Sequence, residues 1–210
     1  MLEMLRGLEQ KVDAFRKSYK YNSELSINNK ETVLHLITTN AYNHDAMWRT
    51  LRKETADAHI DQNNKATVIE WLYKEIEKLF NSSINTQADF DIWHNTMCQK
   101  LTSKINAEVL FGYKPIHMGK AQKIINMSFK YLSSLDGADN YESYFNYCHI
   151  PLDDNILKWY YSNIAKNVSQ NQYKNWSNLE YKDYIKIQKD FRNYCEGTEY
   201  VPLSLEWKIF

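Results

Sequence analysis

Apolar side chains recur every three or four positions along four stretches of this chain, which is the period of an α-helix with one buried face. The repeats predict helices over residues 65–81, 87–106 and 119–132 and a last long helix from about Tyr181 to Cys195. The residues expected to pack inward are Val68, Leu72, Ile76, Leu79, Phe80, Phe90, Trp93, Met97, Leu101, Ile105, Ala121, Ile124, Ile125, Ser128, Phe129, Leu132, Tyr181, Tyr184, Ile185, Gln188, Phe191 and Cys195.

Polar residues that can accept a hydrogen bond from a free backbone N–H group mark several helix starts. In each case an acidic residue follows three positions later and can reach back to the same turn. The three pairs are Asn28 with Glu31, Thr86 with Asp89, and Ser177 with Glu180. We therefore predict helix N-termini at these places.

The last ten residues follow a different pattern. Val201, Leu203, Leu205, Trp207 and Ile209 alternate with more polar residues. A period of two is typical of an extended segment with one apolar face. We expect an extended C-terminal tail that lies along the helices and buries Trp207; alternatively, the tail docks onto a partner protein.

The composition agrees with a helical fold. The chain of 210 residues has only 5 glycines and 3 prolines, whereas sheet proteins need many turns built from these residues. We predict an all-α fold in which residues 1–210 form a single compact domain of about seven or eight helices.

Several features indicate a cytoplasmic protein. No apolar run approaches the roughly 18 residues needed to cross a bilayer, and the first residues show no secretory signal, so we expect no membrane association. The cysteines are Cys98, Cys148 and Cys195, an odd number without a C-x-x-C pair. We expect them to be reduced and unpaired.

The charge balance gives two opposing indications about DNA. The formal net charge is +0, whereas nucleic-acid-binding proteins usually carry a basic surplus. However, residues 100–192 hold 13 Lys and Arg against 9 Asp and Glu, while residues 1–99 hold 12 against 14. The basic half is also the half with the strongest candidate chemistry.

That candidate chemistry begins in the predicted helix over residues 119–132. Lys123, Asn126 and Lys130 stand at positions i, i+3 and i+7 and therefore share one helix face. After a loop, Pro151 stops the incoming chain and Asp153 opens the next helix at or near its N-cap.

A lysine early in an apolar helix, followed by Pro-Leu-Asp at the head of another helix, resembles the helix-hairpin-helix DNA glycosylase superfamily, and most nearly its archaeal 8-oxoguanine branch. Lys123 matches the lysine of the family motif and Asp153 the aspartate, 30 residues later, and the likeness covers roughly 40 residues. In place of the family's Gly-x-Gly hairpin this chain has residues 111–119, with Gly112 and Gly119.

The resemblance implies a DNA-base N-glycosylase that can also act as an abasic-site lyase. In the family the lysine amine attacks the anomeric carbon of the deoxyribose and expels the base, and the aspartate helps to deprotonate the amine and stabilises the sugar cation. Physical chemistry is consistent with both roles. Burial favours the neutral, nucleophilic form of a lysine, and a helix N-terminus keeps a carboxylate ionised.

DNA is the expected partner, and a flipped base needs a pocket with polar and aromatic walls. Asn126 and Lys130 are candidate substrate-binding residues because they share the helix face of Lys123. Trp159 is a candidate for stacking on the base, as are Tyr160 and Trp176. We expect no cofactor.

We expect no metal site either. Asp57, His59 and Asp61 alternate, and His149 precedes Asp153 by four positions, but neither group is a recognised ligand set.

The alternative function is a non-enzymatic helical module that binds another protein. In that case Asp153 is a plain helix cap and Lys123 a solvated surface residue. The two hypotheses differ in geometry: an enzyme requires Lys123 and Asp153 to meet within a few ångströms in a cleft, whereas the alternative lets them lie apart or point to solvent.

Overall fold

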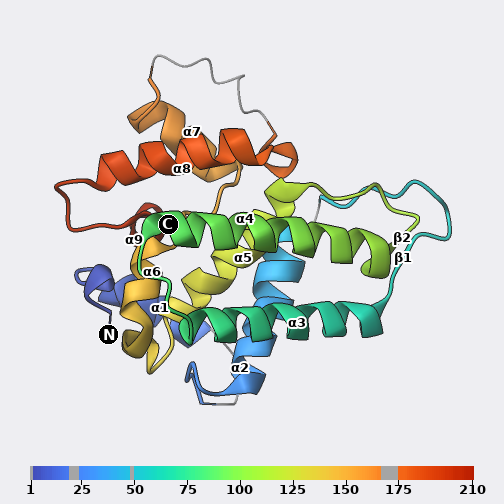
Figure 1. The fold of residues 1–210 in the computed structure, drawn as a ribbon, viewed down its shortest axis with the longest axis horizontal. Coiled ribbons are helices and arrows are strands. Elements are labelled where there is room, and N and C mark those ends of the chain that lie inside the picture. Colours follow the sequence, from blue (N-terminus) through green and yellow to red (C-terminus); the bar gives the residue numbers. More distant parts are fainter. Residues whose placement is uncertain (1, 19–23, 48–49, 167–174) are drawn as a thin grey trace.

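The computed structural model describes residues 2–18, 24–47, 50–166 and 175–210, drawn as a coloured ribbon in Figure 1. Over these residues the chain forms nine α-helices, which confirms the all-α prediction. They are α1 (Glu9–Ser18), α2 (Lys30–His35), α3 (Gln62–Phe80), α4 (Gln87–Lys104), α5 (Met118–Ser133), α6 (Glu142–Tyr147), α7 (Asp154–Asn163), α8 (Tyr181–Cys195) and α9 (Pro202–Ile209).

Shorter elements connect these helices. The π-helical segments η2 (Leu36–Met47) and η3 (Ile105–Val109) continue α2 and α4, and 3-10 turns form at Glu3–Leu5 (η1), Ala138–Tyr141 (η4) and Trp176–Asn178 (η5). Strands β1 (His59–Ile60) and β2 (Leu110–Phe111) pair antiparallel, with His59 opposite Phe111.

The predicted helix starts are confirmed in one case and shifted or wrong in two. Thr86 accepts a hydrogen bond from the backbone N–H of Asp89 and caps α4. For α2 the cap is Asn29 rather than Asn28, because it is Asn29 that accepts from the N–H of Thr32. Ser177 lies in the turn η5 instead, and α8 begins only at Tyr181, without a side-chain cap.

The prediction of an extended C-terminal tail is wrong, because residues 202–209 form the helix α9. Pro202 stands at its first position, where its fixed φ favours a helix, and the Ser204 hydroxyl bonds the Val201 backbone. Every side chain from Pro202 to Trp207 is buried. The alternation of apolar and polar residues therefore does not separate a buried face from an exposed one. The expected burial of Trp207 is confirmed, at 4% exposure.

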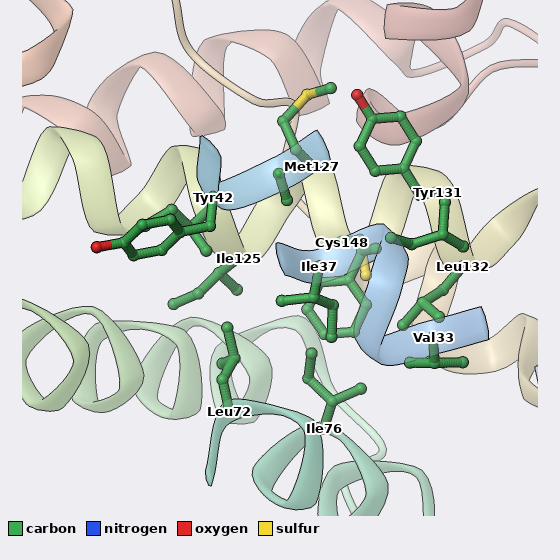
Figure 2. Packing of buried hydrophobic residues seen from close by; sticks show 14 of the residues in the cluster. Val33, Ile37, Tyr42, Leu72, Ile76, Ile125, Met127, Tyr131, Leu132 and Cys148 are labelled. Carbon is green, nitrogen blue, oxygen red and sulfur yellow. The ribbon is translucent and has the colours of Figure 1, made fainter. Parts of the chain in front are cut away.

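Helix α5 is the centre of the molecule and is buried from Gly119 to Ser133. Figure 2 shows Ile125 and Leu132 of α5 packed among Ile37 of η2 and Leu72 and Ile76 of α3. These residues belong to a first apolar cluster, which is formed mainly by η1 to α6 together with Leu203 and Trp207 of α9.

A second apolar cluster lies between α7 and α8, which are drawn above α4 and α5 in Figure 1. Its members include Ile156 and Tyr160 of α7 and Ile187 and Phe191 of α8. Leu205 of α9 also belongs to it, so this one short helix contributes to both clusters.

Two further expectations can be compared with the structure. All three cysteines are buried and free, as predicted. Among the helices that the structure describes, none is both long and apolar enough to cross a membrane.

Candidate functional site

Helices α5 and α7 bring Lys123 and Asp153 together. Lys123 Nζ donates to Asp153 Oδ2 across 3.0 Å, although the two residues are 30 positions apart. The other carboxylate oxygen, Oδ1, accepts from the N–H groups of Asn155 and Ile156, each at 2.9 Å, and so caps α7. The predicted proximity and the predicted cap are confirmed, and the catalytic roles of both residues stay a prediction.

The pair is largely shielded from water. Lys123 is 8% exposed, so it is not the solvated surface residue that the alternative function requires. Its ammonium lies 5.0 Å from the ring centroid of Trp176, a distance at which a cation is attracted to an aromatic face. Trp176 is thus the aromatic candidate whose ring lies beside the Lys123 ammonium.

Gly119 allows the segment around Trp176 to approach α5 closely. A Cβ atom at position 119 would lie 1.9 Å from the Trp176 carbonyl oxygen and 2.7 Å from the Ser177 carbonyl carbon. Both contacts are with backbone, so a larger residue would push residues 175–178 away. The glycine thus places Trp176 beside Lys123.

A cleft of about 390 Å³ is lined in part by Trp176. Its walls come from the start of α5, the loop before it, the η5 turn, the segment after residue 49 and the first residue of α7. They consist of Thr50, Leu51, Arg52, Lys114, Pro115, Ile116, His117, Lys120, Asp154, Asn175, Trp176, Ser177 and Asn178. Lys123 and Asp153 do not themselves line this cleft, contrary to expectation, but Trp176 contacts both the cleft and Lys123.

Sequence reasoning missed Lys120, one helical turn before Lys123. Its side chain is 6% exposed and donates a hydrogen bond to the hydroxyl of Thr50. Burial, assisted by the nearby charge of Arg52, lowers the pKa of Lys120 to about 8. The only sequence signal was the spacing of three positions, which places Lys120 near Lys123.

The candidate substrate-binding residues do not gather at this cleft. Asn126 is completely buried and bonds Tyr184, Gln122 and His94. Trp159 of α7 stacks on Phe191 of α8, with ring centroids 5.9 Å apart.

Lys130, the third candidate, forms a buried ion pair with Glu206 of α9. Its ammonium also lies 4.5 Å from the ring centroid of Trp207. Burial raises the pKa of Glu206, although the charge of Lys130 opposes that effect and the charge of Asp153 adds to it. The ion pair between Lys130 and Glu206 is therefore electrostatically coupled to the pair between Lys123 and Asp153.

A directed chain of buried hydrogen bonds runs beside α5. Asn126 Nδ2 donates to the Tyr184 hydroxyl at 2.8 Å, and this oxygen lies 2.8 Å from His149 Nδ1. His149 Nε2 lies 2.8 Å from a carboxylate oxygen of Asp91, which can only accept, so this nitrogen carries the proton. Burial lowers the pKa of His149, which leaves Nδ1 of the neutral ring to accept from Tyr184.

Asp91 closes this chain. Two nitrogens of Arg192 each lie 3.1 Å from one oxygen of Asp91. Burial raises the pKa of Asp91, but the hydrogen bonds from His149 and Gln87 and the charge of Arg192 outweigh that effect and bring the pKa to about 2. Asp91 is therefore a carboxylate that stays ionised inside the fold.

Two glutamines hold the backbone that leads to Asp153. Gln122 of α5 donates to the Leu152 carbonyl at 2.9 Å and accepts from the Leu152 N–H at 3.2 Å. Gln188 of α8 bonds both backbone groups of Ile150 in the same way, at 2.8 and 3.1 Å. Residues 150–152, which lead to Asp153, are thus held by glutamine side chains rather than by regular secondary structure.

Residues 111–119 do not form a glycine hairpin. Gly112 has φ of +68° in the turn after β2, and its carbonyl accepts from the N–H groups of Glu54 and Thr55. Asp61, one of the residues considered for a metal, caps α3 through the N–H of Asn64. Among the described residues, no group of three His, Cys, Asp or Glu side chains is close enough to hold a metal ion.

Comparison with known protein families, with curated proteins and with solved structures finds no match for this chain.

Proposed function

We propose that this chain is a DNA-base N-glycosylase with abasic-site lyase activity, in which Lys123 is the nucleophile and Asp153 its carboxylate partner. The observation that carries the proposal is the partly buried contact of 3.0 Å between Lys123 Nζ and Asp153 Oδ2. A nucleophile held within hydrogen-bonding reach of a base that is itself fixed by another contact is the arrangement of an activated nucleophile.

The chemistry follows from this arrangement. Asp153 Oδ2 accepts a proton from the Lys123 ammonium, while Oδ1 stays bonded to the start of α7, where the helix dipole favours negative charge. The lysine amine then forms a bond from Nζ to the anomeric carbon of the deoxyribose, and the bond to the base breaks, with its electron pair leaving on the base. The bond from the anomeric carbon to the ring oxygen breaks next, its electron pair and a proton from Nζ go to that oxygen, and a Schiff base remains on Lys123.

Lys130 and Trp207 act indirectly in this proposal, because they are only 8% and 4% exposed. Lys130 stands on the same helix as Lys123, two turns further on, and its charge is balanced by Glu206. Asn126 acts indirectly in this proposal, because it is buried among Gln122, Tyr184 and His94.

Borohydride trapping on an oligonucleotide with an abasic site tests the proposal. Borohydride reduces a Schiff base to a stable covalent protein–DNA adduct. Wild-type protein and Lys130→Gln should form the adduct, whereas Lys123→Gln should lose it and keep its thermal stability. If Lys120→Gln lost the adduct while Lys123→Gln kept it, the nucleophile would be Lys120 and the proposal for Lys123 would be wrong.

A companion assay measures base release followed by alkaline cleavage at the resulting abasic site. Asp153→Asn should slow base release, and it should also cost up to about 2 kcal/mol by weakening the cap of α7. The unfolding free energy of this variant is therefore measured beside its rate. A rate unchanged from wild type would remove Asp153 from the reaction.

A further inference from the structure

Three cations line the cleft beside Trp176 without a carboxylate to neutralise them. Arg52 and Lys114 are exposed at its rim and Lys120 is buried in its wall. Asp154 is the one acidic residue among the lining residues. In the part of the chain that the structure describes, no carboxylate forms an ion pair with Arg52, Lys114 or Lys120.

Lys120 differs in this respect from the other two buried lysines of α5. Lys123 has Asp153 as its counterion and Lys130 has Glu206. Lys120 has only the neutral hydroxyl of Thr50. A buried ammonium without a counterion is costly, and a second cation at the same cleft adds repulsion, so this arrangement favours an anion in the cleft.

The start of α5 adds to this field. The helix runs for 16 residues from Met118, and its N-cap residue His117, which lines the cleft, makes no side-chain hydrogen bond to the first turn. The N–H of Lys120 bonds the His117 carbonyl, but the positive end of the helix dipole still attracts phosphate groups. The cavity, the unpaired cations and the helix start therefore all favour the same ligand chemistry.

We infer that the cleft lined by Arg52, Lys114 and Lys120 binds a phosphate group, namely a phosphodiester of the DNA strand whose sugar reaches Lys123. The assignment to DNA rests on the proposed function. Lys120 and Lys123 are three residues apart on α5, about 4.5 Å along the helix axis, which suits a phosphate next to the attacked sugar. Side-chain cations would then take the place of a glycine-rich hairpin as the contact with the strand.

The test measures binding to a duplex with a tetrahydrofuran abasic analogue, which cannot form a Schiff base with any lysine. The double variant Arg52→Gln/Lys114→Gln should weaken binding at least tenfold at about 100 mM salt, and the slope of log K against log salt should fall by about 1 to 2. Lys100→Gln, an exposed lysine of α4 that does not line the cleft, is the control and should bind like wild type. Equal affinities and slopes for the double variant and this control would overturn the inference.

A second arm separates the source of the phosphate. Inorganic phosphate is titrated into the protein while the backbone amide signals of residues 117–120 are followed by NMR, with chloride at equal ionic strength as the control. Phosphate-specific shifts that vanish in the double variant support a phosphate site. Such shifts without any effect of the double variant on duplex binding would overturn the assignment to DNA, and no shifts in either protein would overturn the site itself.

The inference and the proposed function fail separately. Cleft-dependent duplex binding without a borohydride adduct would refute the glycosylase and support the phosphate site. An adduct on Lys123, together with duplex binding that is unchanged in Arg52→Gln/Lys114→Gln, would support the glycosylase and refute the phosphate site.

Discussion

The three buried lysines of α5 show how single partners decide what a residue can do. Lys120, Lys123 and Lys130 are 6%, 8% and 8% exposed, so burial does not distinguish them. What differs is the partner: a hydroxyl, a helix-capping carboxylate and a buried glutamate, respectively. Lys123 and Lys130 each have a carboxylate partner and an aromatic neighbour, but only the carboxylate beside Lys123 also caps a helix. This helix-capping carboxylate makes Lys123 the proposed nucleophile.

Asp91 gives a prediction about acid stability. Its pKa of about 2 in the folded protein lies below the usual 3.8, so the folded state favours the ionised form. The resulting stability is fully present above pH 4 and is lost as the pH falls through about 2. The shift corresponds to about 2 kcal/mol. Asp91→Asn should therefore lower the unfolding free energy at pH 7 by about 2 kcal/mol and flatten its decline between pH 4 and pH 2.

Urea unfolding at a series of pH values measures this effect. Asp139→Asn, which changes an exposed aspartate of the η4 turn, is the control and should leave the profile unchanged. The interpretation of Asp91 is wrong if its variant is as stable as this control at pH 7.

Residue-level prediction from the sequence succeeded where local signals exist. Asp153 follows a proline at a helix start, and Lys123 stands early in a strongly periodic helix. The helix that carries each residue could therefore be predicted. Asn126 was expected to face the substrate because it shares a face with Lys123. That part of the face is covered by Tyr184 of α8, 58 residues away, which no local pattern indicates.

At the scale of elements, the long helices were predictable because they cover many periods. The expected helix over residues 65–81 is observed as α3 (Gln62–Phe80), and that over 87–106 as α4 (Gln87–Lys104). The tail was not predictable in this way, since five alternating apolar residues also fit a short helix that is buried on all sides. Pro202 at the first helical position was the signal that favoured a helix.

Helix α9 should be essential for stability rather than a free tail. Deleting residues 202–210 removes Trp207 from the core and leaves Lys130 buried without its counterion. Loss of the buried Trp207 side chain alone should cost about 3–5 kcal/mol. Thermal unfolding of the deletion variant should show a large drop in Tm.

Deletion of Phe210 alone is the matched control, because this side chain is 53% exposed and should matter little. A Tm for the 202–210 deletion close to that of the control would show that α9 contributes little to the fold.

The two glutamines that hold the segment before Asp153 allow a test of positioning. Gln122→Leu removes both contacts with the Leu152 backbone, next to Asp153, whereas Gln188→Leu removes the equivalent contacts with Ile150. Each change should cost about 1–3 kcal/mol, because buried backbone groups lose their partners. Only Gln122→Leu should also lower kcat for base release, by roughly tenfold, with KM unchanged.

Single-turnover and steady-state assays of both variants decide the question. If kcat fell equally in both variants, in proportion to their loss of unfolding free energy, Gln122 would have only a structural role.

At the scale of the whole molecule, the candidate site lies where two apolar clusters meet. Cys148 belongs to the first cluster and Ile150 to the second, so the segment that leads to Asp153 passes from one to the other. Buried polar residues fill the boundary, among them His149, which packs against Phe90 of the first cluster and Tyr184 of the second. A sequence pattern describes each helix face singly, and for this reason the boundary could not be predicted.

The overall charge was equally uninformative about the site. The net charge is +0, yet the cleft brings Arg52 together with Lys114 and Lys120, which stand more than 60 positions later in the sequence. Only folding brings these cations together at the start of α5.

The central claim is that Lys123 attacks the sugar, and peptide mass spectrometry of the borohydride-trapped complex tests it most directly. The wild-type protein is trapped on an abasic oligonucleotide, digested with protease and nuclease, and the modified peptide is sequenced. The account predicts that the reduced sugar remnant is attached to Lys123. Attachment to Lys120 or any other residue, or the absence of any modified peptide while the duplex is bound, would contradict it.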